Sequence, residues 1–325
     1  MAGGWDAAAT ANFSSRISRQ EILESSDKLT LPVARGAMRE VGCRISAAEF
    51  SMNLTVVISG KSYGVDLSRP CDLAIPLDFA GPQPRFFGAP DAASKPFQNN
   101  DFIGATSRSG SCNVSEIHMV PHCNGTHTET VGHIVEGAIP VTEALTQSLL
   151  PATLITVTPV PAGETGESYQ PVPRDSDFVI TETLLSAAMS GASDGEIGAL
   201  VIRTRPNDGS KRARDYGDGP APPYFTADAM GYLSARGVTH LLVDMPSIDR
   251  MNDGGYLTNH HIFWNVSAGS HELAQGSRTD RTVTEMVFVD DSITDGLYLL
   301  NLQIPAFVSD AAPSRPVLYP LVETG

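Results

Sequence analysis

Cysteine, positive charge and long apolar runs are all scarce in this sequence of 325 residues. The four cysteines (Cys43, Cys71, Cys112 and Cys123) are too few and too widely spaced to form a disulfide framework. No apolar run approaches the length that crosses a bilayer, and the first residues lack the basic and apolar regions of a signal peptide. We therefore expect reduced thiols and a cytoplasmic location.

The shortage of positive charge argues against two classes of partner. Lys and Arg together number 22 against 37 Asp and Glu, which gives a formal net charge of −15. Nucleic acids and anionic membranes bind basic surfaces, so we expect neither as a partner. The apolar content of 41% is that of an ordinary globular protein, and a chain of this length can bury a large core.

Residues that carry chemistry are concentrated in one stretch, Cys123-Asn-Gly-Thr-His127-Thr-Glu129-Thr-Val-Gly-His133, which follows His122. Thiolate, neutral imidazole and carboxylate are the side chains that bind a divalent metal such as Zn²⁺ or Mn²⁺. On an extended segment, positions 123, 127 and 129 share one face, and Gly125 leaves a place on that face free. Histidines can cluster by chance, but a metal site explains this density better.

Two kinds of metal site are compatible with these residues. A metal held by Cys123, His127 and Glu129 leaves a coordination position open, as in catalytic sites, and His133 nearby could act as an acid–base. Water on such a metal could attack a carbonyl as hydroxide. A site closed by four ligands, such as His122, Cys123, His127 and His260, would be purely structural.

Apolar runs on either side of a predicted helix indicate the fold class. Residues 198–204 and 240–245 are apolar strands, and Thr226 can cap a helix over 227–236. Such runs imply adjacent parallel strands that are buried on both faces. We predict an α/β fold, with a mostly β core, a parallel portion and surrounding helices. Residues 1–48 read as an N-terminal extension and 49–325 as one domain.

Three further features bear on ligands. The loop 76–96 is long and rich in Pro and Gly, so Phe86 and Phe87 within it either line a substrate pocket or anchor the loop to the core. The run Asp244-Met-Pro-Ser-Ile-Asp249 is predicted to form a turn rather than to supply an acid–base pair. Candidate clamps for an anionic group are few, namely Arg203, Arg205 and Arg250.

The stretch from 123 to 133 resembles the signature of the cyclase family of metal-dependent hydrolases, which includes kynurenine formamidase and isatin hydrolase. The family pattern is His-x-Gly-Thr-His-x-Asp-x-Pro-x-His. Gly125, Thr126, His127 and His133 match it, whereas Glu129 replaces the Asp, Val131 the Pro, and Cys123 the first His. The resemblance extends over roughly residues 63–303.

The resemblance implies a set of roles. Cys123, His127, Glu129 and His260 would be ligands of one or two metals, and His133 the acid–base. His260 is preferred to His261 because it would head an apolar segment, and neighbouring side chains on a strand face opposite ways. The family's last ligand is a Glu, and its place falls at Asn301.

From the motif and the resemblance we predict an arylformamidase-like hydrolase that opens an amide, lactam or lactone bond of a small molecule through metal-bound hydroxide. The resemblance also implies a homodimer. The alternative is a catalytically degenerate cyclase-like protein that binds a metal or ligand. The substitutions at Cys123, Glu129 and Asn301 support that alternative.

Overall fold

The structure, a computed structural model, describes residues 54–137, 139–217 and 219–324. All of them belong to one structural unit. The predicted extension over residues 1–48 lies outside the described residues. Within the described part of the chain, no helix is long and apolar enough to cross a membrane.

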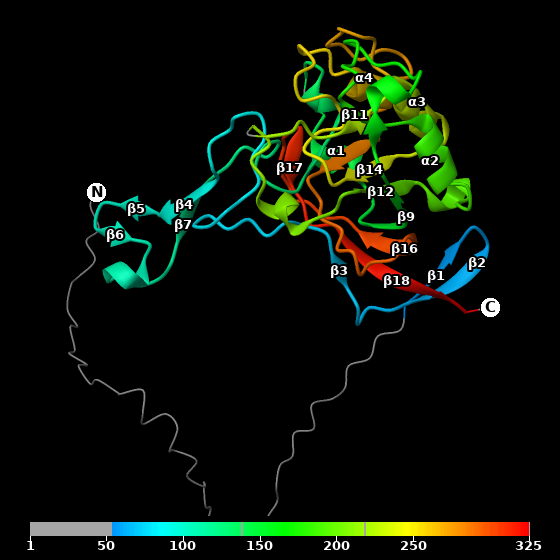
Figure 1. Cartoon of the computed structure of the whole chain (residues 1–325). Helices are drawn as coiled ribbons and strands as arrows, with labels where there is room; N and C mark the ends of the chain where they lie inside the picture. The colour runs from blue at the N-terminus through cyan, green and yellow to red at the C-terminus, as the bar shows by residue number, and fades with distance from the viewer. Residues whose placement is uncertain (1–53, 138, 218, 325) are drawn as a thin grey trace, which may run out of the picture. The chain divides into compact units, whose positions relative to one another are not determined.

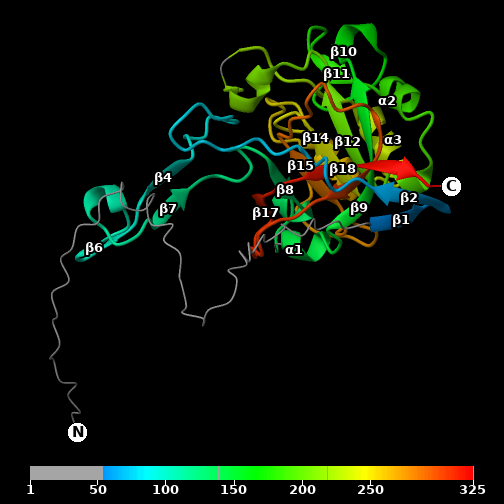
Figure 2. The ribbon, with the colours of Figure 1, turned by 90° about the horizontal axis from the view of Figure 1, so that it is seen from below.

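The centre of the fold is a set of parallel strands with apolar side chains on both faces. It consists of β9 (Leu149–Val157), β12 (Ala199–Thr204), β14 (His240–Val243) and β15 (Thr282–Glu285), each parallel to the next. Figure 1 labels the first three of these strands, and Figure 2 labels all four. The helix α3 (Ala227–Ala235) connects β12 to β14, and Thr226 Oγ1 accepts a hydrogen bond from Ala229 N at 3.0 Å. The predicted βαβ unit is therefore present.

Antiparallel strands extend this sheet at both sides. On one side β15 pairs with β8 (His127–Glu129), which pairs with β17 (Ala311–Pro313) (Figure 2). On the other side the order from β9 is β16 (Gly296–Asn301), β18 (Val317–Glu323), β2 (Lys61–Val65) and β1 (Leu54–Ile58), and β3 (Cys71–Asp72) also pairs with β18. The predicted α/β fold with a mostly β core and a parallel portion is confirmed.

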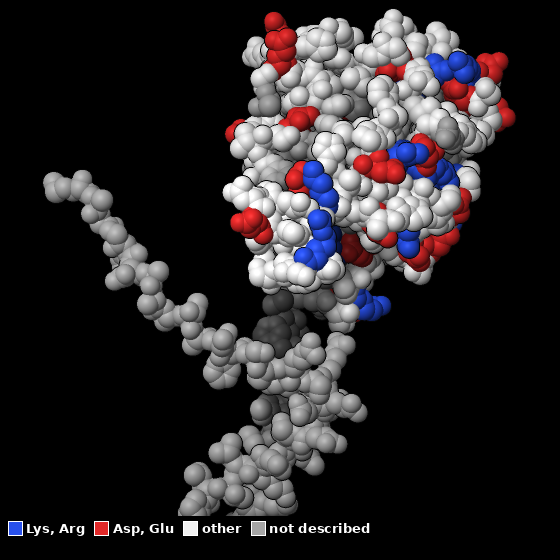
Figure 3. Space-filling model, turned by 90° about the vertical axis from the view of Figure 1, so that its left-hand side faces the viewer, with Lys and Arg blue, Asp and Glu red and all other residues white. Residues whose placement is uncertain are grey.

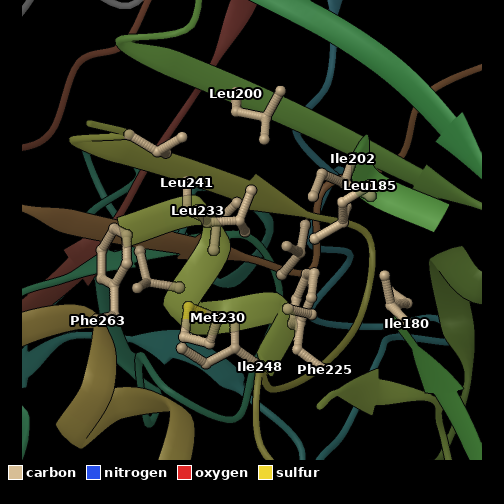
Figure 4. Close-up of a cluster of buried hydrophobic side chains, with 14 of the residues drawn as sticks. Ile180, Leu185, Leu200, Ile202, Phe225, Met230, Leu233, Leu241, Ile248 and Phe263 are labelled. Atoms are coloured by element: carbon tan, nitrogen blue, oxygen red, sulfur yellow. The ribbon is translucent and has the colours of Figure 1, made fainter. Parts of the chain in front are cut away.

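Successive residues of the parallel strands pack into two different clusters. Leu200 and Ile202 lie in a cluster with Met230 and Leu233 of α3 (Figure 4), whereas Val201 faces the opposite cluster. Period-2 alternation explains this division, because neighbouring side chains of a strand point to opposite faces. The first cluster also contains residues of α2 (Glu182–Ala188) and α4 (Thr258–Trp264).

Short elements complete the described part of the chain. Three small sheets are formed by β4 (Ala93–Pro96) with β7 (Ser115–His118), β5 (Gln98–Asn99) with β6 (Phe102–Ile103), and β10 (Val160–Pro161) with β11 (Phe178–Ile180) and β13 (Tyr224–Phe225). The remaining helices are α1 (Val141–Ala144) and the 3-10 turns Thr106–Arg108, Val131–His133, Ala162–Glu164, Asp194–Glu196 and Gly209–Ala213.

His240 makes the stability of this sheet depend on pH. It is 8% exposed at the start of β14, with Nδ1 2.9 Å from Thr282 Oγ1, and burial lowers the pKa of His240 from 6.5 to about 4. The unfolded chain therefore takes up a proton at a higher pH than the folded chain does. Stability from the neutral imidazole is complete above pH 6.5 and is lost as the pH falls toward 4, a loss of about 3 kcal/mol.

We expect His240→Asn, which preserves a polar partner for Thr282, to reduce this acid sensitivity. The free energy of unfolding in urea should fall by about 2–3 kcal/mol less in the variant than in the wild type between about pH 7.5 and about pH 4.5. The matched control is His118→Asn, which changes an exposed histidine of β7 and should behave as the wild type. The same acid loss in all three proteins would contradict the role of His240.

Candidate metal centre

The site begins at β8, which lies between β15 and β17. His127 and Glu129 are 0% and 1% exposed and, two residues apart on a strand, share a face. His127 is directly opposite Glu285 of β15 in the strand register. Cys123 lies in the turn before β8, so the predicted shared face holds for positions 127 and 129 only.

The imidazole of His127 has a free nitrogen inside the protein. Its Nδ1 donates to Gly125 O at 3.0 Å, which leaves a lone pair on Nε2. This Nε2 is buried without a hydrogen-bond partner and lies 3.6 Å from Glu285 Oε2. Burial lowers the pKa of His127 to about 4, so the ring is neutral. A backbone carbonyl on the second nitrogen is the usual arrangement for a metal-binding histidine.

Glu129 is surrounded by three histidines. Its Oε1 is 2.9 Å from His260 Nε2, and its Oε2 is 2.8 Å from His122 Nδ1 and 3.9 Å from His133 Nδ1. Burial would raise the pKa of Glu129, but these histidines together hold it well below the ordinary value. The carboxylate is therefore charged in the interior, where a charge requires partners of opposite sign.

Glu285 is a second buried carboxylate at the site, and the sequence analysis missed it. It is 4% exposed; Oε1 accepts a hydrogen bond from Ile248 N at 2.9 Å and lies 3.9 Å from His260 Nε2. Burial, together with the charge of Glu129, raises its pKa well above the ordinary value. Because the charge of Glu129 raises the pKa of Glu285, a cation bound at this site would stabilise both carboxylates in their charged forms.

Asn301 does not reach the cluster. It is on β16, and the strands β9, β12, β14 and β15 separate β16 from β8 in the sheet. Asn301 therefore does not take the place of the last acidic ligand. Glu285, which lies beside His127 and His260, is the carboxylate at that place. The sequence feature that could have indicated Glu285 is its position as a carboxylate at the end of the strand over 282–285.

His260 reaches the site from a helix rather than from a strand. The segment expected to be extended forms α4, and Asp249 accepts hydrogen bonds from Asn259 N and His260 N at its start, at 2.7 and 3.2 Å. Asp249 Oδ2 is also 2.5 Å from His260 Nδ1, which directs Nε2 toward Glu129. Burial lowers the pKa of His260, but Asp249 and Glu129 raise it well above the ordinary value. His261 is buried, and its Nδ1 has no partner there.

His122 is closer to the cluster than Cys123 is. The ligand atoms of His122, His127 and Glu129 all lie within 4.8 Å of one another, whereas among the described residues Cys123 belongs to no such group. His122 Nε2 is also 2.8 Å from Asp310 Oδ2. Cys123 lines the adjoining cavity, and burial raises the pKa of its thiol, which disfavours the thiolate that binds metals.

His133 is at the boundary between the cluster and open space. It ends the 3-10 turn Val131–His133, and the side chain of the N-cap residue Thr130 accepts a hydrogen bond from Gly132 N. Its ring centroid lies 4.4 Å from that of His122 and 5.3 Å from that of His260, and its side chain is 28% exposed. Burial lowers the pKa of His133 below 6.5, so the imidazole is neutral at neutral pH and can accept a proton.

A cavity of about 660 Å³ adjoins the cluster. Glu129, His133, His260 and Glu285 are among its lining residues, and many of the others belong to the segment 246–257. Phe86 and Phe87 are also in its wall, and their contact with a substrate stays a prediction. Phe87 is 74% exposed, so its ring is available to a ligand.

Comparison with known proteins identifies the family. A family model described as "Putative cyclase" matches residues 65–250, more than half of the chain, and the chain belongs to this cyclase family. The match ends before His260 and Glu285, so these two site residues come from the structure alone. No curated protein matches the chain.

Solved structures with the same fold agree with this assignment. They include a potential metal-dependent hydrolase with cyclase activity (17% identity, TM-score 0.51, covering 77% of this chain and 97% of the other). An isatin hydrolase bound to the product analogue thioisatinate has 18% identity, a TM-score of 0.52, and coverage of 79% and 93%. Isatin hydrolase A from Ralstonia solanacearum has 18% identity, a TM-score of 0.51, and coverage of 78% and 92%. At these identities the similarity shows the fold.

The cluster suggests a divalent metal, and we expect about one or two equivalents of it in protein purified without added metal. Glu285→Gln keeps the side chain's size and removes its charge, so metal affinity should fall at least about tenfold, measured by elemental analysis after dialysis. Asn301→Ala is the matched control and should keep its metal, because β16 lies elsewhere in the sheet. Full metal in Glu285→Gln would exclude Glu285 as a ligand.

A second pair of variants tests whether His122 or Cys123 is the metal ligand that precedes His127 in the sequence. His122→Ala should lose metal about tenfold more readily than Cys123→Ser, because His122 contacts Glu129 and Cys123 lies outside the group. The measurement is the dissociation constant for Zn²⁺, obtained by competition with a chelator. The reverse order would assign the position to the thiolate, as the family resemblance implies.

Proposed function

We propose that the protein is a metal-dependent hydrolase that opens an amide, lactam or lactone bond of a small molecule. The observation that carries this proposal is the buried Nε2 of His127, which has no hydrogen-bond partner and lies 3.6 Å from the carboxylate of Glu285. Membership of the cyclase family supports it, as do solved structures of the same fold described as a metal-dependent hydrolase and as isatin hydrolases.

The donor set fits a divalent cation. His122, His127 and Glu129 have ligand atoms within 4.8 Å of one another, as do Glu129, His133 and His260, and Glu285 Oε2 lies 3.6 Å from His127 Nε2. These nitrogen and oxygen donors, with Cys123 as the alternative to His122, suit Zn²⁺ or Mn²⁺. When bound, such a cation polarises a carbonyl oxygen and lowers the pKa of a water ligand. Gly125 O and Asp249 fix the rings of His127 and His260, so the donors are oriented before anything binds.

His133 is suited to move the proton. It lines the cavity as a neutral imidazole, and its Nδ1 lies 3.9 Å from both Glu129 Oε2 and Asp310 Oδ2. These carboxylates would stabilise the imidazolium that forms when His133 takes a proton from the attacking water. The same proton can then pass to the departing nitrogen or oxygen of the substrate.

We expect His133→Gln to lower kcat by about 10²–10⁴-fold, because general acid–base catalysis contributes that much. The assay is a panel of formamides, lactams and lactones, first screened with the wild type. Metal content and the free energy of unfolding should not change, which separates a lost proton carrier from a lost metal. Unchanged kcat in His133→Gln would remove this residue from the mechanism.

A binding protein without catalysis is the alternative, and the replacement of family residues at Cys123 and Glu129 favours it. A metal-loaded wild type that turns over nothing in the panel would support this alternative. The homodimer and the cytoplasmic location stay predictions. Sedimentation measurements on the purified chain test the first of these.

A further inference from the structure

Arg250 is the one Lys or Arg among the residues that line the cavity beside the metal centre. We propose that Arg250 binds an anionic substituent of the substrate, a carboxylate remote from the bond that is cleaved. This inference rests on the proposed hydrolase function and narrows its substrates to amides, lactams or lactones that carry such a group.

The guanidinium of Arg250 is held in place but incompletely used. Its side chain is 14% exposed, and Nη2 lies 2.9 Å from Asp177 Oδ2. Its backbone N donates to Tyr169 Oη at 3.1 Å, which fixes the main chain at this point. A guanidinium has five N–H donors, and Asp177 is its one carboxylate partner among the described residues, so donors are left for a ligand.

The other two candidate arginines are committed to the fold. Arg203 donates to Thr156 Oγ1 and Asp295 Oδ1, and also to the backbone oxygens of Asp290 and Ile293. Arg205 pairs with Asp291. On the face drawn in Figure 3, Lys and Arg side chains likewise lie beside Asp and Glu side chains rather than in one basic patch.

Arg250 stands at the wall between two cavities. With Met251 and Asn252 it lines both the cavity of about 660 Å³ and a second one of about 290 Å³. The main chain that follows this wall is also fixed, because Asp253 accepts hydrogen bonds from Gly255 N and Leu257 N at 2.8 and 2.6 Å. Asp177, which lies 2.9 Å from the guanidinium, lines the second cavity, so a ligand that reaches this shared wall meets a charge that is already in position.

The acidic groups of the cavity do not cancel Arg250. Asp249 is occupied by Tyr169 and His260, and Asp253 by backbone N–H groups. Glu129 and Glu285 face the metal centre. Bidentate guanidinium–carboxylate pairs are among the strongest hydrogen-bonded contacts in proteins. In a chain of net charge −15, a fixed cation is what makes a carboxylate ligand acceptable.

The test compares benzoate with its neutral isostere benzamide, by calorimetric titration of the metal-containing protein. We expect the wild type to bind benzoate at least about tenfold more tightly, the effect of one charge-assisted pair. Arg250→Gln should bring the two affinities to within about twofold and leave benzamide binding unchanged, whereas Arg250→Lys should keep part of the preference.

Asp177→Asn is the matched variant, because it removes the carboxylate that competes for Arg250. It should tighten benzoate binding severalfold; weaker binding would mean that the pair is only structural and would overturn the proposal. A preference that persists in Arg250→Gln would place the carboxylate on the metal and also overturn it, as would equal binding by the wild type. Because binding needs no turnover, an Arg250-dependent preference in a protein that hydrolyses nothing would keep this site and refute the hydrolase.

Discussion

Two carboxylates buried side by side, Glu129 and Glu285, are the constraint on which the site depends. They are 1% and 4% exposed on adjacent strands, and the charge of Glu129, together with burial, raises the pKa of Glu285 well above its ordinary value. Desolvation of two like charges is costly unless cations compensate it. The histidines supply part of that compensation, and the free lone pair of His127 shows where a metal would supply the rest. The strand pairing of β8 with β15 keeps these groups together.

The rest of the fold orients the remaining donors. The helix α4 begins at Thr258, and the Asp249 carboxylate that accepts hydrogen bonds from Asn259 N and His260 N in its first turn also holds His260 Nδ1. Tyr169 Oη donates to Asp249 at 2.8 Å, which fixes that carboxylate in turn. A displacement of the helix start would therefore move His260 directly. Fold stability and ligand geometry are coupled through this one side chain.

Local pattern was sufficient for part of this structure. The apolar runs around the 227–236 segment predicted the parallel strands, and the spacing of His127 and Glu129 predicted their shared face. The sequence did not predict Glu285 as a site residue, because its proximity to His127 depends on strand register between segments more than 150 residues apart. The sequence predicts an extended segment at His260, where the structure has the helix α4. Short apolar runs fit a helix or a strand equally well. Asn301 was placed by order along the chain, which does not report order in the sheet.

The site histidines differ in exposure, and this difference indicates which of them bind a metal and which one carries a proton. His127 and His260 are 0% and 1% exposed, and the Nδ1 atom of each is hydrogen-bonded, to Gly125 O and to Asp249 respectively. Neither histidine can therefore exchange a proton readily with solvent. The side chain of His133 is 28% exposed, lines the cavity and makes no hydrogen bond to the described residues. A proton carrier must reach both the reacting atoms and water. Of these three, His133 alone meets that requirement, while the buried two are better suited to hold a metal.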